Sequence, residues 1–505
     1  MSASVLAGGL MVCGTTSDAG KSTLVAGLCR WLYRRGVRVA PFKAQNMSLN
    51  AAVTPSGGEI GRAQAFQAFA AGVAPEVTMN PVLLKPVGER TCQVVVNGRP
   101  WRVTSAAGYH ELKDELFPEV VAAYRSLRSR FDVVICEGAG SPAEINLFDR
   151  DIVNLRLADA VGIAAVLVGD INPGGVFASL YGTVGLLPPE WSRLVRGFVI
   201  NKLRGDPELL LDGCAKLEGL TGVPALGVLP WLETVWLDAE DSMSIDRPLP
   251  EPRPALADEL DVAVIRLPRI ANATDLDALR IEPGVRLRWV HDAAGFGRPD
   301  LVILPGSKST VNDLAWLRTR KLDTALASTD ATVLGICAGY QMLGHSIDDR
   351  VESASGLVKG LGFLPVDTVF GPEKVTRLRT GHADGARVSG YQIHHGRVRQ
   401  TGGDPFVVFD DSDPAELDGV RAGRFVGTTL HGLFDADEFR RNFLGQVAAS
   451  RGKRWYSDGP SLEALRTAAV DSLADVLEER LDLDAVEQLI AWSDAGAATA
   501  PGGMR

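Results

Sequence analysis

The sequence predicts an α/β protein made of two parallel-sheet units in series. In both halves, short apolar runs lead into glycine-rich loops and then into helical patterns, the alternation typical of doubly wound sheets. A chain of 505 residues is too long for one hydrophobic core, so two large domains are favoured. The stretch RPLPEPRP at 247–254 spaces its prolines evenly and can neither continue a helix nor pair as a central strand. It predicts a semi-rigid linker.

Domain boundaries follow from this linker and from the end of the chain. Leu473, Val476, Leu477 and Leu481 recur at steps of three and four residues, which indicates a helical stripe that packs into a core. We expect a first α/β domain, a linker, a second α/β domain, a C-terminal helical segment and a disordered tail at 1–246, 247–258, 259–455, 456–493 and 494–505.

Composition limits the classes of partner. A net charge of -10 without a cluster of basic residues argues against nucleic acid or a membrane surface as the partner. The six cysteines show no close pairing, which suits neither a zinc site nor a disulfide framework. The sequence has no secretory start and no apolar stretch of membrane-spanning length. We therefore expect a cytoplasmic protein.

The first motif is GTTSDAGKS, between a predicted buried strand at 10–13 and a predicted helix at 22–35. Backbone amides of such a loop cradle phosphates at a helix N-terminus, with Lys21 on the β and γ oxygens and Ser22 on Mg²⁺. The alternative is an ordinary glycine-rich turn between strand and helix. The predicted ATP-binding residues here are Gly14, Thr15, Thr16, Asp18, Ala19, Gly20, Lys21 and Ser22.

Later strands end at the same predicted sheet edge, where ligands of such folds bind. The run FDVVIC at 131–136 ends in Glu137, which we expect to bind Mg²⁺ opposite the phosphate loop. Asn201 follows the strand at 197–200 and is a candidate for contact with the base. The strand at 37–42 opens into PFKAQNMSLN, where Lys43 is either a ligand of phosphate or carboxylate, or a solvated lysine. The substrate candidates of this stretch are Lys43, Gln45, Asn46 and Asn50.

The second half carries a candidate nucleophile in VLGICAGYQMLG at 333–344. Gly335 and Gly339 stand two positions before and after Cys337, which is the pattern of a strand-turn-helix elbow. The following helix would direct its free amides at the sulfur and favour the thiolate. The alternative is a small buried cysteine that closes a core strand.

A thiolate that attacks an amide needs a base and an oxyanion site. Of the seven histidines, His431 alone follows a strand-like run, FVGTTL at 425–430, and so lies where side chains reach a cleft. The buried-strand run at 301–304 opens into PGSKST at 305–310, whose backbone amides are suited to hold an oxyanion. We expect the heptapeptide GYQIHHG at 390–396 to form a strand and a turn.

Together, the elbow, PGSKST and His431 resemble a class I glutamine amidotransferase domain. That family usually places Pro and then Glu after the histidine, where this chain has Gly432 and Leu433. The group that orients His431 is therefore not identified by the pattern. The spacing of GTTSDAGKS is similar to that of dethiobiotin-synthetase-like enzymes. The predicted fold is a doubly wound P-loop NTPase-like domain followed by a class I glutamine amidotransferase α/β domain.

The order of GTTSDAGKS, PFKAQNMSLN, EGAGS, PGSKST, GICAGYQ, GYQIHHG and HGLF resembles the cobyric acid synthase family (CobQ type) over nearly the whole chain. The resemblance implies ATP- and Mg²⁺-dependent amidation of the b, d, e and g carboxylates of the corrinoid adenosylcobyrinic acid a,c-diamide, with L-glutamine as nitrogen donor. It implies Cys337 and His431 as catalytic residues and backbone amides near Gly306 and Ala338 as the oxyanion site. Two alternatives remain: a cobyrinic acid a,c-diamide synthase, and a non-enzymatic P-loop switch protein.

Overall fold

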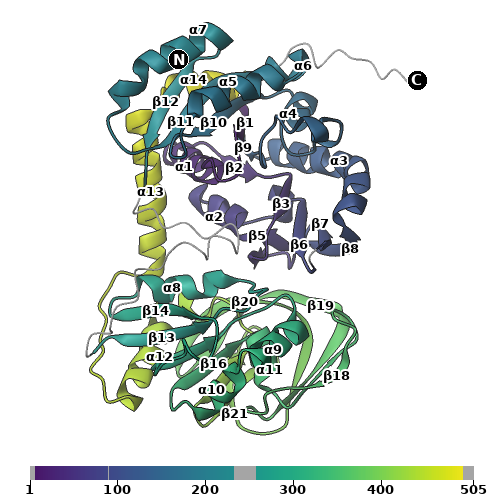
Figure 1. Ribbon diagram of the computed structural model, residues 1–505, viewed down its shortest axis with the longest axis vertical. Coiled ribbons are helices and arrows are strands. Elements are labelled where there is room, and N and C mark those ends of the chain that lie inside the picture. Colours follow the sequence, from purple (N-terminus) through teal and green to yellow (C-terminus); the bar gives the residue numbers. More distant parts are fainter. Residues whose placement is uncertain (1–5, 89, 233–257, 493–505) are drawn as a thin grey trace. The chain divides into compact units, whose positions relative to one another are not determined.

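The computed structural model describes residues 6–88, 90–232 and 258–492. The chain forms two compact units (Figure 1). Unit 1 holds the described parts of 1–47, 60–237 and 465–505, and unit 2 those of 48–59 and 238–464. The expected linker at 247–258, except for its last residue, and the expected tail at 494–505 lie outside the described residues. No helix in the described ranges is long and apolar enough to cross a membrane.

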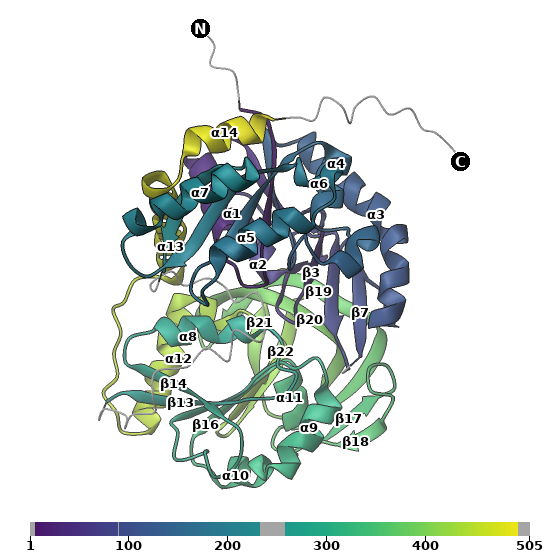
Figure 2. The same ribbon diagram turned by 45° about the horizontal axis from the view of Figure 1, so that its top comes forward.

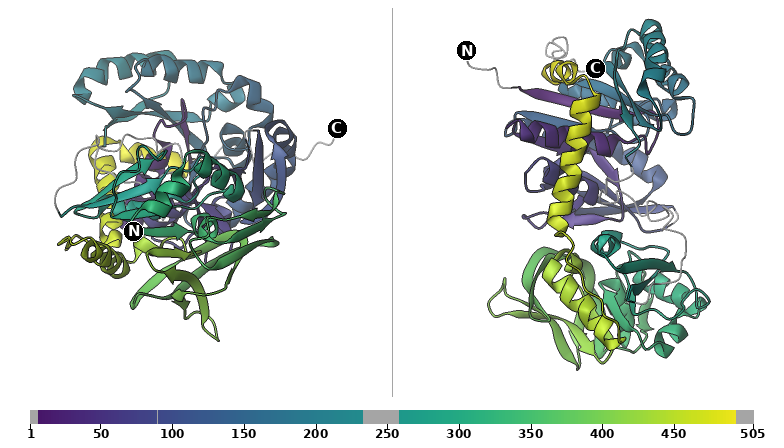
Figure 3. Two further views of the ribbon diagram at one scale, coloured as in Figure 1. Left: turned by 60° about the horizontal axis from the view of Figure 1, so that its bottom comes forward. Right: turned by 90° about the vertical axis from the view of Figure 1, so that its left-hand side faces the viewer.

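Unit 1 is built on a six-stranded sheet with the order β12-β11-β10-β1-β9-β2, all pairs being parallel. Leu10 and Val12 face a core with helix α1, while Met11 and Cys13 are equally buried on the other face. Helices thus cover both faces, as Figure 3 shows, and the doubly wound fold is confirmed. The strands are β1 (Gly8–Gly14), β2 (Val39–Phe42), β9 (Val133–Glu137), β10 (Ala164–Asp170), β11 (Val195–Leu203) and β12 (Ala225–Pro230).

A second sheet in unit 1 has the order β3-β6-β7-β8. Its strands are β3 (Gln45–Met47), β6 (Val82–Pro86), β7 (Thr91–Val96) and β8 (Arg99–Ser105). The α-helices of the unit's first part are α1 (Lys21–Arg34), α2 (Arg62–Ala70), α3 (Ala106–Arg128), α4 (Leu155–Val161), α5 (Val176–Leu186), α6 (Pro189–Ser192) and α7 (Leu211–Thr221).

The C-terminal segment forms two helices, α13 (Leu462–Arg480) and α14 (Leu483–Ala491), rather than one continuous helical stretch. The break has a local cause: Leu481 bridges to Gly227 of β12, and the Asp482 side chain caps α14 by accepting from Ala485 N at 2.9 Å. The predicted core stripe is confirmed, since Leu473 and Leu477 are buried against α1.

Unit 2 contains an eleven-stranded mixed sheet. Strands β14-β13-β15-β16-β23 run parallel, and β22, β21, β19, β17 and β18 continue the sheet on one side in antiparallel pairs, except for the parallel pair β19-β17. The strands are β13 (Leu260–Ile265), β14 (Val285–Val290), β15 (Leu301–Leu304), β16 (Thr332–Ile336), β17 (Ser346–Asp349), β18 (Gly356–Lys359), β19 (Val366–Ala383), β20 (Ala386–Gln400), β21 (Asp404–Phe409), β22 (Glu416–Ala422) and β23 (Phe425–Thr428). The α-helices are α8 (Asp277–Ile281), α9 (Thr310–Thr319), α10 (Leu322–Ser328), α11 (Ala338–Leu343) and α12 (Asp437–Ser450).

The expected turn within 390–396 is wrong, because the whole heptapeptide lies inside the long strand β20 (Figure 2). Its glycines serve close packing instead of chain reversal. A Cβ at Gly390 would lie 2.1 Å from the carbonyl oxygen of His431, and one at Gly396 would lie 2.6 Å from Nε2 of Gln341. Glycine in a strand often marks such an approach.

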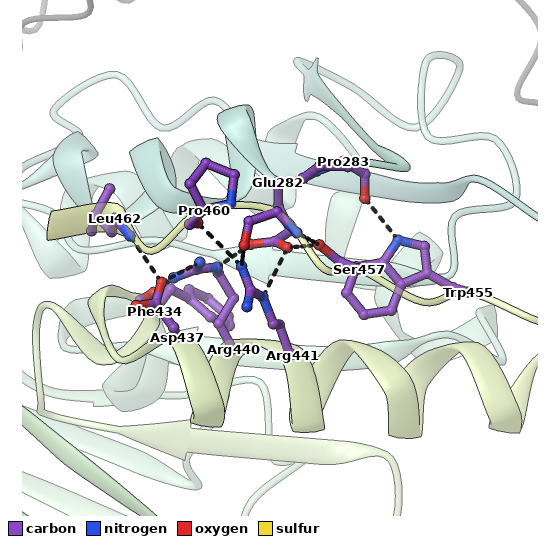
Figure 4. Close-up of polar contacts among 11 residues, drawn as sticks. Glu282, Pro283, Phe434, Asp437, Arg440, Arg441, Trp455, Ser457, Pro460 and Leu462 are labelled. Carbon is purple, nitrogen blue, oxygen red and sulfur yellow. Dashed lines mark hydrogen bonds and ion pairs between the residues drawn. The ribbon is translucent and has the colours of Figure 1, made fainter. Parts of the chain in front are cut away.

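A buried ionic network joins α12 to the segment that leads into α13 (Figure 4). The side chain of Arg440 is 1% exposed and donates to Glu282 Oε2 at 2.5 Å, Asp437 Oδ1 at 2.6 Å and the carbonyl oxygen of Phe434 at 2.7 Å. Arg441 and Ser457 also donate to Glu282. Because Phe434 lies shortly after His431, the network supports the strand end that carries the candidate base.

Replacing Arg440 by alanine should destabilise unit 2 by about 3–5 kcal/mol, since it leaves the buried carboxylate of Glu282 without its main partner. Urea unfolding followed by tryptophan fluorescence would measure this, because Trp455 donates to the carbonyl oxygen of Pro283 beside the network. Arg441→Ala is the matched control: its side chain is 27% exposed and should cost about 1 kcal/mol. Equal effects of the two substitutions would contradict this assignment.

Candidate active sites

The glycine-rich loop of unit 1 joins β1 to α1. Gly20 has φ of 100° and Asp18 has φ of 57°, so the loop makes the tight turn that exposes backbone amides at the start of α1. Lys21 is buried, and its Nζ donates to the carbonyl oxygens of Thr16 at 3.0 Å and Gly140 at 3.4 Å. The ammonium group is thus held over the loop, where a bound phosphate would compete for it.

Glu137 is the last residue of β9, the neighbour of β1, and several polar groups beside the loop donate to its carboxylate. Oε1 accepts from Ser22 Oγ at 2.8 Å and from Lys43 Nζ at 2.7 Å, and Oε2 accepts from Gln67 Nε2 at 2.6 Å. The side chains of Lys43 and Glu137 are 5% and 0% exposed. The structure therefore brings together Ser22, Glu137 and Lys43.

The other predicted residues of unit 1 engage protein groups. Gln45 accepts from the hydroxyl of Tyr109 at 2.5 Å, and Asn46 Nδ2 donates to Gln64 Oε1 at 2.9 Å. Asn201 Nδ2 donates to the carbonyl oxygen of Ala19 at 3.0 Å, so this side chain supports the phosphate loop. Asn50 is not grouped with these residues, because it belongs to unit 2.

Cys337 in unit 2 occupies the predicted sharp turn between β16 and α11. Its φ of 51° is unusual for a residue with a side chain, and its backbone N–H donates to the carbonyl oxygen of Thr428 at 2.8 Å. The flanking glycines are required by sterics: a Cβ at Gly339 would lie 1.9 Å from the carbonyl oxygen of Leu304, and one at Gly335 2.7 Å from the backbone nitrogen of Tyr340. The elbow exists because only glycine fits on both sides of the cysteine.

His431 is buried, and its ring lies between two polar side chains. Nδ1 is 2.7 Å from Asp275 Oδ2, and Nε2 is 3.3 Å from Asn272 Nδ2. The second oxygen of Asp275 accepts from the backbone N–H of Gly432 at 2.8 Å, so the carboxylate is fixed at both oxygens. A proline at 432 would lack that donor.

The electrostatics of this arrangement favour a charged imidazole. Burial alone would lower the pKa of His431, but the charges of Asp275 and Cys337 and hydrogen bonds to both outweigh burial and raise the pKa to about 10. The imidazolium is the form that His431 takes once it has accepted the thiol proton, so the raised pKa favours that transfer. Asp275 holds the ring in the orientation in which Nδ1 carries a proton.

The surroundings of His431 come from the loop after β15, from β20 and from the turn into α11. A Cβ at Gly306, just after β15, would lie 3.0 Å from Cε1 of His431, which places the predicted oxyanion loop beside the ring. Tyr391 of β20 stacks on the ring with centroids 5.3 Å apart and exchanges two backbone hydrogen bonds with His431. Ala338 is the first residue of α11, directly after the thiol.

Sequence reasoning missed Asp275 and Asn272. Both lie at the short 3₁₀ helix η5 (Ala273–Leu276), which follows β13, and both are at most 5% exposed. The signal in the sequence was the polar run of ANATDLD after the apolar strand at 261–266. Carboxyl ends of parallel strands meet at one sheet edge, which is why this run lies beside His431.

Comparisons with known proteins cover both units. The CbiA family, a CobQ/CobB/MinD/ParA nucleotide binding domain, matches residues 10–245. The GATase_3 family, a CobB/CobQ-like glutamine amidotransferase domain, matches residues 261–439. The first match contains the phosphate loop and Glu137, and the second contains Asp275, Cys337 and His431.

Curated relatives extend the match over nearly the whole chain. A cobyric acid synthase of Rhodococcus jostii (strain RHA1) is 52% identical over 498 residues, which cover 97% of both chains. Cobyric acid synthases of Nocardia farcinica (strain IFM 10152) and Streptomyces coelicolor (strain ATCC BAA-471 / A3(2) / M145) are each 51% identical over 96% of both chains. The chain belongs to the cobyric acid synthase family.

Proposed function

We propose that this protein is a glutamine-hydrolysing cobyric acid synthase, which uses ATP to amidate carboxylates b, d, e and g of adenosylcobyrinic acid a,c-diamide in the cytoplasm. The observation that carries the proposal is that one chain holds both a phosphate loop with an adjacent buried carboxylate and a cysteine elbow with an oriented histidine. Full-length identity near 50% to cobyric acid synthases supports the choice of substrate.

In unit 2, Cys337 would attack the γ-carboxamide of glutamine. The thiol proton passes to His431 Nε2, and the imidazolium then gives a proton to the departing ammonia, which leaves a γ-glutamyl thioester. Asp275 keeps Nδ1 protonated and stabilises the imidazolium. Backbone amides near Gly306 and Ala338 are the proposed donors to the oxyanion. Water then releases glutamate and restores the thiol.

In unit 1, a carboxylate of the substrate would attack the γ-phosphorus of ATP, because a free carboxylate is a poor acceptor for ammonia. The bond to the β-γ bridging oxygen breaks, ADP leaves and an acyl phosphate forms. Lys21 would balance the charge on the phosphate oxygens. Ammonia then replaces phosphate at the acyl carbon, and the products are the amide and inorganic phosphate.

The residues of this site fit a magnesium ion. The hydroxyl of Ser22 and the carboxylate of Glu137 are oxygen ligands, and they lie 2.8 Å apart beside the phosphate loop. Mg²⁺ is bound at such sites by one or two side chains together with phosphate oxygens, and there it neutralises charge on the phosphates. We propose Ser22 and Glu137 as its protein ligands.

Substrate recognition is proposed to rest on local donors, since the whole protein is acidic. Lys43, Gln45 and Asn46 are the candidates, because Lys43 is held against Glu137 and the other two are close to it in sequence. Asn50 is better assigned a structural part, since its side-chain oxygen accepts from the backbone N–H of Ala273 at 3.1 Å.

A site that hydrogen-bonds its substrate's amides rejects analogues that lack them. The purified protein with ATP, Mg²⁺ and glutamine is therefore expected to convert the a,c-diamide much faster than cobyrinic acid, by about 100-fold in kcat/KM. Mass spectrometry of the products would show up to four added amides. If the protein converted only cobyrinic acid, and the reaction stopped at the diamide, the protein would instead be a cobyrinic acid a,c-diamide synthase.

A further inference from the structure

Residues 48–59, here called the inserted hairpin, belong to unit 2 although the chain on both sides of them belongs to unit 1. The hairpin contains β4 (Ala51–Val53) and the start of β5 (Glu59–Gly61), which pair as a two-stranded sheet. Its N-terminal end continues from β3, and its C-terminal end continues into α2. Because α2 carries Gln67, which donates to Glu137, the hairpin is a short covalent extension of the phosphate-site elements.

The hairpin is fixed in unit 2 at two buried places. Glu59 and Lys374 of β19 form an ion pair at 2.5 Å, with side chains 0% and 6% exposed. At the other place, two asparagines make reciprocal bonds. Asn50 Oδ1 accepts from the backbone N–H of Ala273 at 3.1 Å, and Asn272 Oδ1 accepts from the backbone N–H of Ala51 at 3.0 Å.

This reciprocal bond determines which way the Asn272 amide points. The backbone N–H of Ala51 can only donate, so the oxygen of Asn272 must face it and the amino group must face His431. An amino group can only donate to Nε2, which is possible only when His431 is neutral with its proton on Nδ1. Asn272 also has φ of 55°, a conformation that asparagine tolerates better than most residues.

Two influences therefore oppose each other on one ring. Asp275 and Cys337 favour the imidazolium, whereas the Asn272 amino group occupies the Nε2 lone pair that must accept the thiol proton. His394 of β20 is a further titratable neighbour besides Tyr391, and burial lowers the pKa of His394 to about 3, so its ring stays neutral. The Asn272 amino group thus lies at the nitrogen that would take the thiol proton.

We propose that Asn272 is a positioning residue that restrains His431, and that its bond to the inserted hairpin holds it in place. The proposal rests on the proposed function for its physiological meaning. Its structural core is the contact of Asn272 with His431 Nε2 and with the backbone of Ala51.

The first test is Asn272→Gly, which keeps a backbone of positive φ while removing the amide. Glutamine hydrolysis without ATP or corrinoid should rise about five- to tenfold, the factor that one hydrogen bond corresponds to. Asn50→Ala, which releases the hairpin from Ala273, should act in the same direction to a smaller extent. Asn97→Gly is the matched control, because Asn97 is an exposed asparagine of φ 47° in unit 1.

The second test is Asn272→Asp, which can still accept from Ala51 but presents a carboxylate oxygen to Nε2. That oxygen favours the imidazolium, which cannot accept the thiol proton, so the rate of glutamine hydrolysis should fall. The acid limb of its pH–rate profile should move to higher pH. Basal hydrolysis that did not rise in Asn272→Gly would overturn the proposal, as would an unmoved acid limb of the pH–rate profile in Asn272→Asp. Both assays measure glutamine hydrolysis and need no turnover of the corrinoid. A protein that failed to amidate the a,c-diamide would refute the proposed function, but its basal hydrolysis would still decide the role of Asn272.

Discussion

Replacing Cys337 by alanine is expected to abolish amidation with glutamine while leaving amidation with ammonium chloride near the wild-type rate. The thiolate is needed only to release nitrogen, whereas activation of the carboxylate by ATP takes place in unit 1. Alanine is close to cysteine in volume and adopts the elbow with little added strain, so the effect should be on chemistry rather than folding. Parallel assays with each nitrogen source would measure it, with product amides counted by mass spectrometry.

Cys214→Ala is the matched control, because Cys214 is a similarly buried cysteine on α7. It should retain both activities. Loss of ammonium-dependent synthesis in a folded Cys337→Ala protein would contradict the separation of the two reactions, and retained glutamine-dependent synthesis would remove Cys337 from the mechanism.

Strands, loops and the two motifs could be predicted because their signals are local. GTTSDAGKS and GICAGYQ each combine an apolar strand, glycines and a polar residue within about ten positions, so backbone sterics alone indicate the turn. The structure shows the steric need for glycine in both turns. A Cβ at Gly20 would lie 1.9 Å from the Asn201 side chain, and a Cβ at Gly339 would lie 1.9 Å from the backbone of Leu304.

Asp275 could not be predicted in the same way, because its partner lies 156 positions away in the sequence. The family pattern directed attention to positions 432 and 433, whereas the carboxylate comes from η5 at the end of another strand of the same sheet. Asn50 is a second case: its neighbours in PFKAQNMSLN predict a substrate contact, but they carry no signal that the chain enters unit 2 at Ser48 or that the Asn50 side chain accepts from Ala273. Tertiary grouping of this kind leaves no periodic signal in the sequence.

Replacing Lys21 by alanine is expected to lower amidation with glutamine and with ammonium alike, by roughly 100-fold or more. The ammonium group of Lys21 is buried over the phosphate loop. Once this ammonium group is removed, the negative charge that develops on the transferring phosphoryl group loses its counter-charge. Added ammonium cannot restore the activity, because the acyl phosphate that ammonia attacks is not formed. The stabilisation of the protein by ATP in thermal unfolding should also weaken.

Lys216→Ala serves as the matched control, since Lys216 is an exposed lysine of α7 that pairs with Asp212 in its own helix. Thermal unfolding without ATP distinguishes a lost phosphate contact from a damaged fold, because only the latter lowers the transition in the absence of nucleotide. The informative comparison is with Cys337→Ala. Ammonium should restore amidation by Cys337→Ala but not by Lys21→Ala. If Lys21→Ala made product from ammonium and ATP at nearly the wild-type rate, carboxylate activation would have to be assigned to residues outside the phosphate loop.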